Sequence, residues 1–437
     1  MERETIFEMV NFHSAGIDIG AEKIFVSVDG KSVVNFRTFT EDYLQCVEYL
    51  KSHQVERVAM EATGVYWIAF YEILEDNGFE VCLVNPKEVK QVKGRKTDVK
   101  DCQWIQKLFS VGLLKESYIP AGKLKELRML VREREDIIDM GGTYVNKMQK
   151  ALELMNIKLK NVLSQIHGVS GRRIIEAILK GERDPEKLLS LCYSSVIKNK
   201  SEEVKKALAG NYNESWLFLL SQNLKMWKQH QAHLLAVDKK IESLLTELTA
   251  TRPTITSSSK QKPIRHHKPE IDSLHQKMLD LYGVNISTLS GITDYSALRL
   301  VGETGFDLNN FPSVKHFISW CRLSPRNSQS GKVNRRLRTK TSSKTGQIFR
   351  EAAQSLLQSK NTAIGAFMRR IRSKKGAPVA IKAGARKLAA AYYNIITQGQ
   401  EYVEQGLKKY EQKNREREIR LLSLLADKHN MSLIINT

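Results

Sequence analysis

Short runs in which apolar and polar residues alternate open the chain. Between residues 14 and 39, the runs AGIDIG, KIFVSVDG and SVVNFRTF alternate Val or Ile with polar residues, and Gly and Asp punctuate the turns. This period of two predicts three strands. Apolar residues three and four apart then predict a helix over residues 41–51.

The pattern of strands and helices continues through residue 118. The run RVAMEA predicts a fourth strand, residues 65–76 a helix, EVCLVN a fifth strand, and a last helix starts near Asp98. Three antiparallel strands followed by strand–helix units are the order of the ribonuclease H-like fold. We therefore expect an α/β domain of this type over residues 1–118.

The middle of the chain, residues 119–250, has a helical pattern. Long helices are predicted over residues 123–166 and 216–248, and Gly141 and Gly142 are expected to break or kink the first. In the second, apolar residues repeat every seven positions, interrupted near His230: Leu220, Trp227, Leu234, Ile241 and Leu248. This repeat, with Val237 and Leu244 between, predicts a coiled-coil seam that pairs within the subunit, between subunits, or both.

Polar composition separates this middle from a second domain. Residues 251–275 begin TRPTITSSSKQKPIRHHKPE, which has no periodicity and predicts a flexible basic linker. Residues 276–400 are predicted to form a mostly helical domain, and 401–437 a charged helical extension. Within the domain, residues 289–304 resemble a helix-hairpin-helix; a plain core helix is the equal alternative.

The net charge of the chain says more about its partners than its overall composition does. The 437 residues carry a net charge of +21 with a pI of 9.6, and the basic residues are spread along the whole chain. Such a field favours nucleic acid as partner. No apolar run reaches the ~20 residues of a membrane span, and the start MERETIFEMV does not match a signal peptide, so a cytoplasmic protein is expected. The five cysteines and ten histidines lack metal-ligand spacing, so no zinc site is expected.

Four acids form the first candidate site. Asp18 lies within the first strand, Glu61 ends the fourth, and Asp98 and Asp101 stand three apart at the start of the last helix. Strand ends and helix starts meet at one edge of such a sheet. Hard oxygen ligands favour Mg²⁺ or Mn²⁺, which would support phosphoryl transfer. The alternatives are that Asp98 and Asp101 only cap their helix and that Glu61 is an ordinary strand-end acid.

The second candidate site is the basic segment RLSPRNSQSG, residues 322–331. Ser330 stands beside a glycine, which lets its hydroxyl approach a bulky phosphate, so it is the candidate nucleophile. Six cations around it are candidate nucleic-acid contacts: Arg326, Lys332, Arg335, Arg336, Arg338 and Lys344. The alternative is a basic surface loop in which Ser and Gly only form turns.

Together these stretches resemble the DEDD transposases of insertion sequences. Four motifs carry the resemblance: GIDIG around Asp18, MEATGVYW around Glu61, KTDVKD around Asp98 and Asp101, and PRNSQSG around Ser330. The family includes pilin-gene inverting proteins and bridge-RNA-guided recombinases. The resemblance implies a RuvC-like domain joined to a serine-bearing transposase domain.

The resemblance also implies a mechanism and partners. Asp18, Glu61, Asp98 and Asp101 would hold Mg²⁺, and Ser330 would form a phosphoserine link to DNA. Acids and serine would come from different subunits of a tetramer built as a dimer of dimers, with a structured guide RNA pairing to the DNA.

One motif departs from the family, and two other functions stay open. Ser330 is followed by Gly331 and then Lys332, where two glycines are usual. A hydrolytic RuvC-like nuclease, such as a junction resolvase, would use water and leave Ser330 structural. A non-catalytic nucleic-acid-binding protein would carry the acids as remnants.

Overall fold

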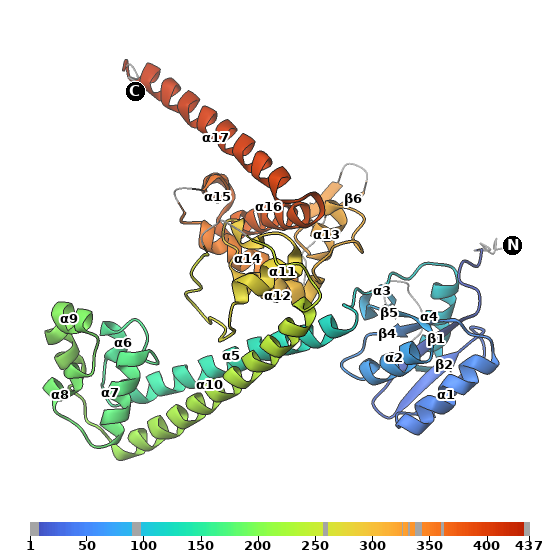
Figure 1. Ribbon diagram of the computed structural model, residues 1–437, viewed down its shortest axis with the longest axis horizontal. Coiled ribbons are helices and arrows are strands. Elements are labelled where there is room, and N and C mark those ends of the chain that lie inside the picture. The colour runs from blue at the N-terminus through green and yellow to red at the C-terminus, as the bar shows by residue number, and fades with distance from the viewer. Residues whose placement is uncertain are drawn as a thin grey trace. The chain divides into compact units, whose positions relative to one another are not determined.

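The computed structural model describes residues 8–89, 98–256, 261–325, 327–330, 333–336, 343–359 and 362–431 (Figure 1). The chain divides into two compact units, Met1–Ile119 and Pro120–Thr437. No helix in the described part of the chain has the length and apolar character needed to cross a bilayer.

The first unit is built on a five-stranded sheet. Its strands are β1 (Ser14–Ile19), β2 (Lys23–Ser27), β3 (Val34–Arg37), β4 (Arg57–Glu61) and β5 (Glu80–Val84). The order across the sheet is β3-β2-β1-β4-β5, with β1–β2 and β2–β3 antiparallel and β1–β4 and β4–β5 parallel. This topology confirms the predicted ribonuclease H-like fold.

Helices cover both faces of the sheet. They are α1 (Thr40–Ser52), α2 (Trp67–Asp76), α3 (Pro86–Val89) and α4 (Asp98–Ser110). One face packs on α1 and α2, where Ile17 and Met60 meet Tyr43 and Phe70. The other face packs on α4, where Ala59 and Val84 lie in the same core as Ile105 and Phe109. Alternate side chains along each strand therefore point to opposite faces of the sheet and pack against different helices.

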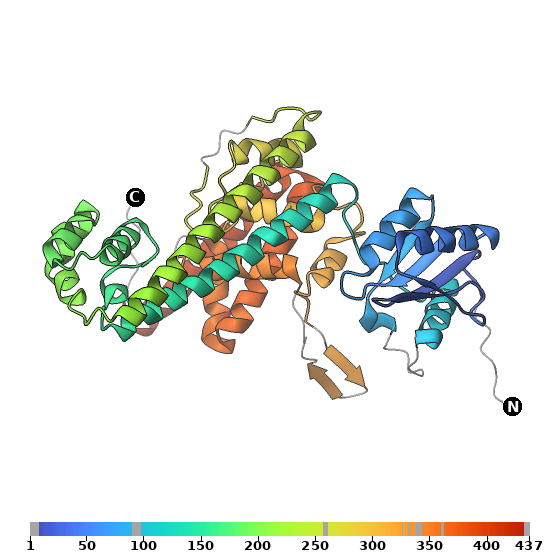
Figure 2. The ribbon, with the colours of Figure 1, turned by 90° about the horizontal axis from the view of Figure 1, so that it is seen from below.

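Two long helices form an arm in the second unit. The helices α5 (Lys123–Leu154) and α10 (Glu214–Thr249) lie side by side and antiparallel, as Figures 1 and 2 show. On α10, Leu220, Trp227 and Ile241 of the predicted seven-residue repeat are buried. Pairing of the coiled-coil seam within the subunit is thus confirmed.

The expected break at Gly141 and Gly142 is wrong. The helix α5 continues through both glycines. A glycine inside a helix costs about 1 kcal/mol relative to alanine. Packing along α10 offsets this cost, and Gly141 itself is buried.

The arm carries a small helical module at its tip. This tip module, residues 155–213, contains α6 (Leu159–Val162), α7 (Val169–Leu179), α8 (Pro185–Ser190) and α9 (Ser194–Ala207). It has its own core, in which Ile174, Ile178 and Leu188 pack with Trp227 of α10. The helix predicted to run to residue 166 ends at Leu154, and α6 to α9 follow it.

The remainder of the second unit is mostly helical. Its elements are α11 (Leu274–Tyr282), the 3-10 helix η1 (Ile286–Thr288), α12 (Asp294–Thr304), α13 (Val314–Trp320), β6 (Asn327–Ser330), β7 (Val333–Arg336), α14 (Lys344–Leu356), α15 (Ala363–Lys375), α16 (Ala377–Gln398) and α17 (Gln400–Lys428). Stacked and edge-on rings of Phe317, Phe349 and Tyr392 fill its core. The predicted fold class, an α/β domain followed by helical regions, is confirmed.

The stretch compared with a helix-hairpin-helix belongs to this core. Ala297, Leu298 and Val301 of α12 are buried. A Cβ on Gly291 would lie 2.8 Å from the Ala352 carbonyl oxygen on α14, so the preceding turn is pressed against that helix. This packing agrees with the alternative that the stretch is a plain core helix.

The described part of the predicted flexible linker is tethered to the helices. Arg252 donates to the Leu281 carbonyl at 2.9 Å and lies over the Phe306 ring. Lys262 Nζ donates to the Leu289 carbonyl at 2.7 Å. Here the structure differs from the prediction, because basic side chains that composition assigns to solvent satisfy carbonyl oxygens of the neighbouring turns.

A buried ion pair lies between the two helices of the arm. Arg134 of α5 and Asp238 of α10 are both almost fully buried, with Nε 2.5 Å from Oδ1. Arg134 also donates to the His267 carbonyl and lies over the Tyr295 ring, 4.7 Å from its centroid. Charges this deep require such compensation. The pair therefore fixes both the arm and the segment that crosses it.

Candidate active site

A close approach of α4 to the central strand β1 shapes the first candidate site. A Cβ on Gly16 would lie 2.4 Å from the Cys102 carbonyl oxygen and 2.3 Å from the Gln106 amide nitrogen. No larger residue fits there without moving the helix. The absence of a side chain at this position thus brings the first turns of α4 onto β1.

Two of the predicted acids are neighbours on the sheet. The parallel register pairs Ile17 with Met60, so Asp18 and Glu61 are the next residues on the two strands. Asp18 lies two residues after Gly16, and Glu61 two after Ala59, which places both on the face that α4 covers. Glu61 is 7% exposed, while Asp18 is partly buried.

The third and fourth acids come from α4 itself. Asp101 is partly buried one turn into the helix, and Asp98 is its first residue; the side chain of Asp98 lies outside what the structure describes. Burial raises the pKa of the Cys102 thiol to about 12, and the negative charges of Asp18 and Asp101 add to the rise. Both carboxylates therefore lie near one point on α4. The structure brings Asp18, Glu61 and Asp101 to one edge of the sheet.

The predicted site has the chemistry of a hard-cation site. Its donors are carboxylate oxygens, which Mg²⁺ and Mn²⁺ prefer. Among the described side chains, no group of three or more His, Cys, Asp or Glu is close enough to hold a metal ion. The predicted acids fit a divalent cation in donor type, and the fourth donor expected from the sequence is Asp98.

Thr63 is a residue that the sequence analysis did not single out. Its hydroxyl donates to Glu61 Oε1 at 3.2 Å, two residues past the end of β4. This hydrogen bond restricts the orientation of the Glu61 carboxylate at the end of β4. Its only signal in the sequence is its place in the MEATG motif, two residues after the predicted acid.

Ser330 stands in a β-hairpin and not in a loop. It is the last residue of β6 and pairs with Val333 of β7, with two residues between them that lie outside the description. In Figure 2 the hairpin projects from the helices of its own unit. A backbone position on such a projecting hairpin suits contact with a large substrate.

The predicted nucleic-acid contacts fall into three groups. Arg335 and Arg336 are on β7, opposite Ser328 and Asn327. The positions Arg326, Lys332 and Arg338 lie outside the described residues. Lys344 starts α14.

The ammonium of Lys344 is 3.3 Å from Glu135 Oε2 on the arm. Arg299 holds the same carboxylate. Lys344 is about half exposed, so its ion pair contributes little stability and leaves the side chain accessible to solvent.

Family models match both units. A model named DEDD_Tnp_IS110, described as a transposase, matches residues 15–157. The transposase model of the IS116/IS110/IS902 family matches residues 284–369. Together the two matches cover more than half of the chain. The chain belongs to the IS110 family of DEDD transposases. No curated protein matches the sequence closely enough to count as a relative.

Membership in this transposase family fixes the general activity. The protein is a transposase whose partner is DNA. The DEDD model covers Asp18, Glu61, Asp98 and Asp101, and the second model covers Ser330. Residues 158–283 of the transposase, which include the tip module from residue 158 on, lie between the two matches.

Proposed function

We propose that this transposase cuts and rejoins DNA through a covalent link between DNA and Ser330, assisted by Mg²⁺ or Mn²⁺. The observation that carries the proposal is the docking of α4, the helix that contains Asp101, on β1 at Gly16, two residues before Asp18. Carboxylate oxygens are the donors that Mg²⁺ and Mn²⁺ prefer.

The proposed chemistry is a transesterification. Ser330 Oγ attacks a backbone phosphorus, a bond from serine oxygen to phosphorus forms, and the bond from phosphorus to one deoxyribose oxygen breaks. The proton of the serine hydroxyl ends on the departing oxygen. A hydroxyl of the partner strand then reverses the step and releases Ser330. The phosphoester energy is kept in the protein link, so no ATP is needed.

The acids and cations have separate roles in this scheme. A bound divalent ion would supply Lewis-acid stabilisation of the phosphate charge. Asp18, Glu61, Asp98 and Asp101 would hold that ion, and Thr63 orients Glu61. Arg335, Arg336 and Lys344, together with Arg326, Lys332 and Arg338, would contact phosphates.

We further propose a guide RNA and a composite site. The net charge of +21 suits both DNA and a structured RNA. Serine and acids belong to different units of the chain, and in the proposed tetramer, a dimer of dimers, one subunit would supply Ser330 to the acids of another.

A denaturing gel tests the chemistry. The protein is mixed with Mg²⁺, RNA transcribed from its flanking element, and labelled DNA carrying the element's ends. We expect a labelled protein–DNA band that survives denaturant, disappears in Ser330→Ala and Asp18→Asn, and persists in two controls. Ser328→Ala removes a hydroxyl from the same strand, and Asp76→Asn an exposed acid from α2.

The gel also separates the alternatives. DNA that is cut without a covalent band, and cut equally by Ser330→Ala, would assign a hydrolytic nuclease and exclude the serine mechanism. Omitting the RNA tests the guide separately, since an unchanged band would remove RNA from the proposal.

A further inference from the structure

The tip module has a charge that its own acids do not balance. Residues 155–213 hold eleven Lys and Arg against six Asp and Glu, a net charge of +5. Lys228 of α10 pairs with Glu176, Lys187 with Glu182, and Lys205 with both Glu186 and Glu202. Most of the acids are therefore already neutralised within the module and by α10.

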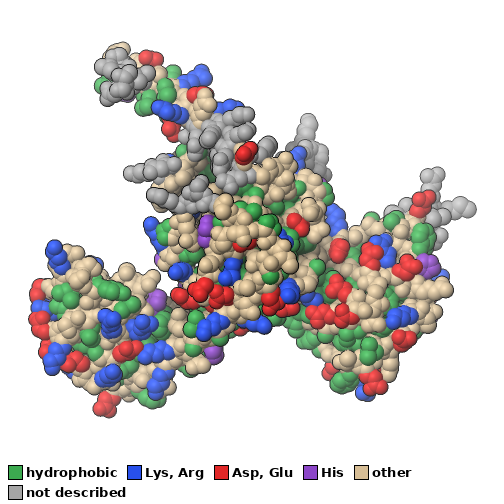
Figure 3. Space-filling view, in the orientation of Figure 1, with side chains coloured by type: hydrophobic (Ala, Val, Ile, Leu, Met, Phe, Trp, Pro, Cys, Tyr) green, Lys and Arg blue, Asp and Glu red, His purple; other side chains and the backbone are tan. Residues whose placement is uncertain are grey.

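Exposed cations remain after this pairing. Five of them form no ion pair with another described residue: Lys160, Arg173, Lys180, Lys198 and Lys206. Figure 3 shows Lys and Arg side chains spread over the visible face of the lobe that carries α6 to α9. A surface of this kind attracts a polyanion.

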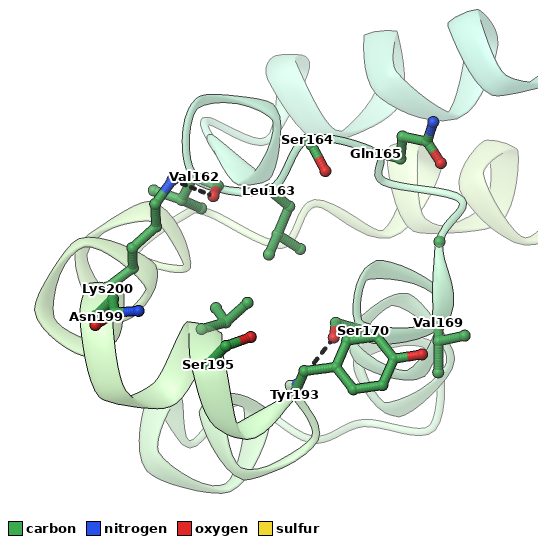
Figure 4. Close-up of a pocket in the computed structure, with 12 residues that line it drawn as sticks. Val162, Leu163, Ser164, Gln165, Val169, Ser170, Tyr193, Ser195, Asn199 and Lys200 are labelled. Carbon is green, nitrogen blue, oxygen red and sulfur yellow. Dashed lines mark hydrogen bonds between the residues drawn. The ribbon is translucent and has the colours of Figure 1, made fainter. Parts of the chain in front are cut away.

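A cavity lined by both apolar and polar residues opens in the same module. It has a volume of about 440 Å³ and is lined by the segments 162–165 and 168–170 and by residues between 193 and 200 (Figure 4). Hydroxyl groups of Ser164, Ser170 and Ser195 lie around it, and Figure 4 shows the Ser195 hydroxyl pointing into its middle. Tyr193 at its rim is 55% exposed.

One cation belongs to the cavity wall. Lys200 interrupts the helical backbone of α9, with φ −142° and ψ 22°, and its Nζ donates to the Val162 carbonyl at 3.1 Å. An ammonium has three N–H donors, so two remain for a ligand. The first turns of α7 and α9, which border the cavity, contain no acid that would repel an anion.

We propose that the tip module binds the phosphodiester backbone of a nucleic acid, with a backbone phosphate seated in the cavity beside Lys200 and Ser195. Lys160 and Lys198, which lie within two residues of lining positions, hold the adjoining phosphates. The serine hydroxyls and the Lys200 ammonium in the partly apolar wall of the cavity supply donors from several sides, which a phosphate needs. The proposal is independent of the serine chemistry and concerns a part of the chain outside both family matches except at residues 155–157.

Local protection locates the contact in the full-length protein. Amide hydrogen exchange is followed with EDTA present, so that no DNA is cut, on adding a short RNA hairpin, duplex DNA or single-stranded DNA. We expect slowed exchange over residues 162–170 and 193–200. The nucleic acid that gives this protection identifies the ligand as RNA or as DNA.

Matched charge reversals test the energetics. K160E/K198E alters the module, and K225E/K239E makes the same change in charge at exposed lysines of α10 outside it. By fluorescence anisotropy at 0.1 M salt, the first should weaken binding at least about tenfold and reduce the salt slope by about 2, as expected for two lost phosphate contacts. The control should change binding much less.

A substitution that enlarges one lining side chain tests the role of the cavity itself. S195W fills the cavity without altering charge, and S190W places the same ring outside it. Wild-type binding by S195W, or equal losses in the two charge-reversed proteins, would overturn the proposal. Circular dichroism confirms that each variant is folded, and because EDTA is present, failure of the serine mechanism leaves this result unaffected.

Discussion

At the scale of single residues, the first candidate site depends on a side chain that is missing. Gly16 lets the backbone of α4 reach β1, and the same contact carries Asp101 toward Asp18. The flanking Ile17 and Ile19 are buried in the opposite layer and hold the strand in place. One glycine therefore couples the fold of the domain to the geometry of its acids.

Gly16→Ala tests this coupling. The new methyl group would lie 2.3 Å from a backbone nitrogen, so α4 has to move. We expect a lower melting temperature, by an amount corresponding to about 1–3 kcal/mol, together with loss of DNA cutting. Gly142→Ala is the control, because a Cβ there meets nothing within 4 Å and an alanine suits the helix. Unchanged cutting by Gly16→Ala would contradict the role given to the close approach.

At the scale of helices and strands, the elements that could be predicted from the sequence are those with side chains buried in a core. The strands around Asp18 and Glu61 were predictable because one side chain in two enters a core. The strands β6 and β7 were not, since NSQS and VNRR contain almost no apolar residue and pair only with each other in the two-stranded sheet. The acids could be found because strand ends and helix starts fix their positions, whereas the hairpin that carries Ser330 has no such signal.

The same scale shows how helix packing overrides propensity. Gly141 and Gly142 predict an interruption when α5 is considered alone, but α10 lies along it. The ion pair between Arg134 and Asp238 could not be predicted either, because these residues are more than a hundred positions apart in the sequence.

Arg134→Ala should destabilise the arm strongly. It leaves the Asp238 carboxylate buried and unpaired, at a cost of about 3–5 kcal/mol. The measurement is thermal unfolding followed by circular dichroism. The double variant Arg134→Met/Asp238→Leu removes both charges and should recover most of the loss. A double variant as unstable as Arg134→Ala would show that packing, and not the uncompensated charge, dominates.

At the scale of the whole molecule, binding and chemistry should be separable. Residues 1–119 carry a net charge of −5 and residues 120–437 one of +26, so the excess of basic residues belongs to the second unit, whereas the four acids proposed as the metal site belong to the first. Affinity for DNA should therefore depend on salt, and cutting on the divalent ion.

Chelation tests this separation. With EDTA we expect unchanged binding of labelled DNA in a mobility-shift assay and no cutting. Adding back Mg²⁺ or Mn²⁺ should restore cutting in the wild-type protein but not in Asp18→Asn. Cutting that persists in EDTA would argue against metal assistance.

The antiparallel arm also means that the tip module could be replaced without changing the rest of the chain. Because the backbone leaves along α5 and returns along α10, the tip module enters and exits at neighbouring points. During evolution, such a stem can acquire, enlarge or lose a terminal lobe without displacing the remaining helices. For protein engineering, it offers a natural graft point where a foreign domain could be inserted between two helix ends that already hold each other.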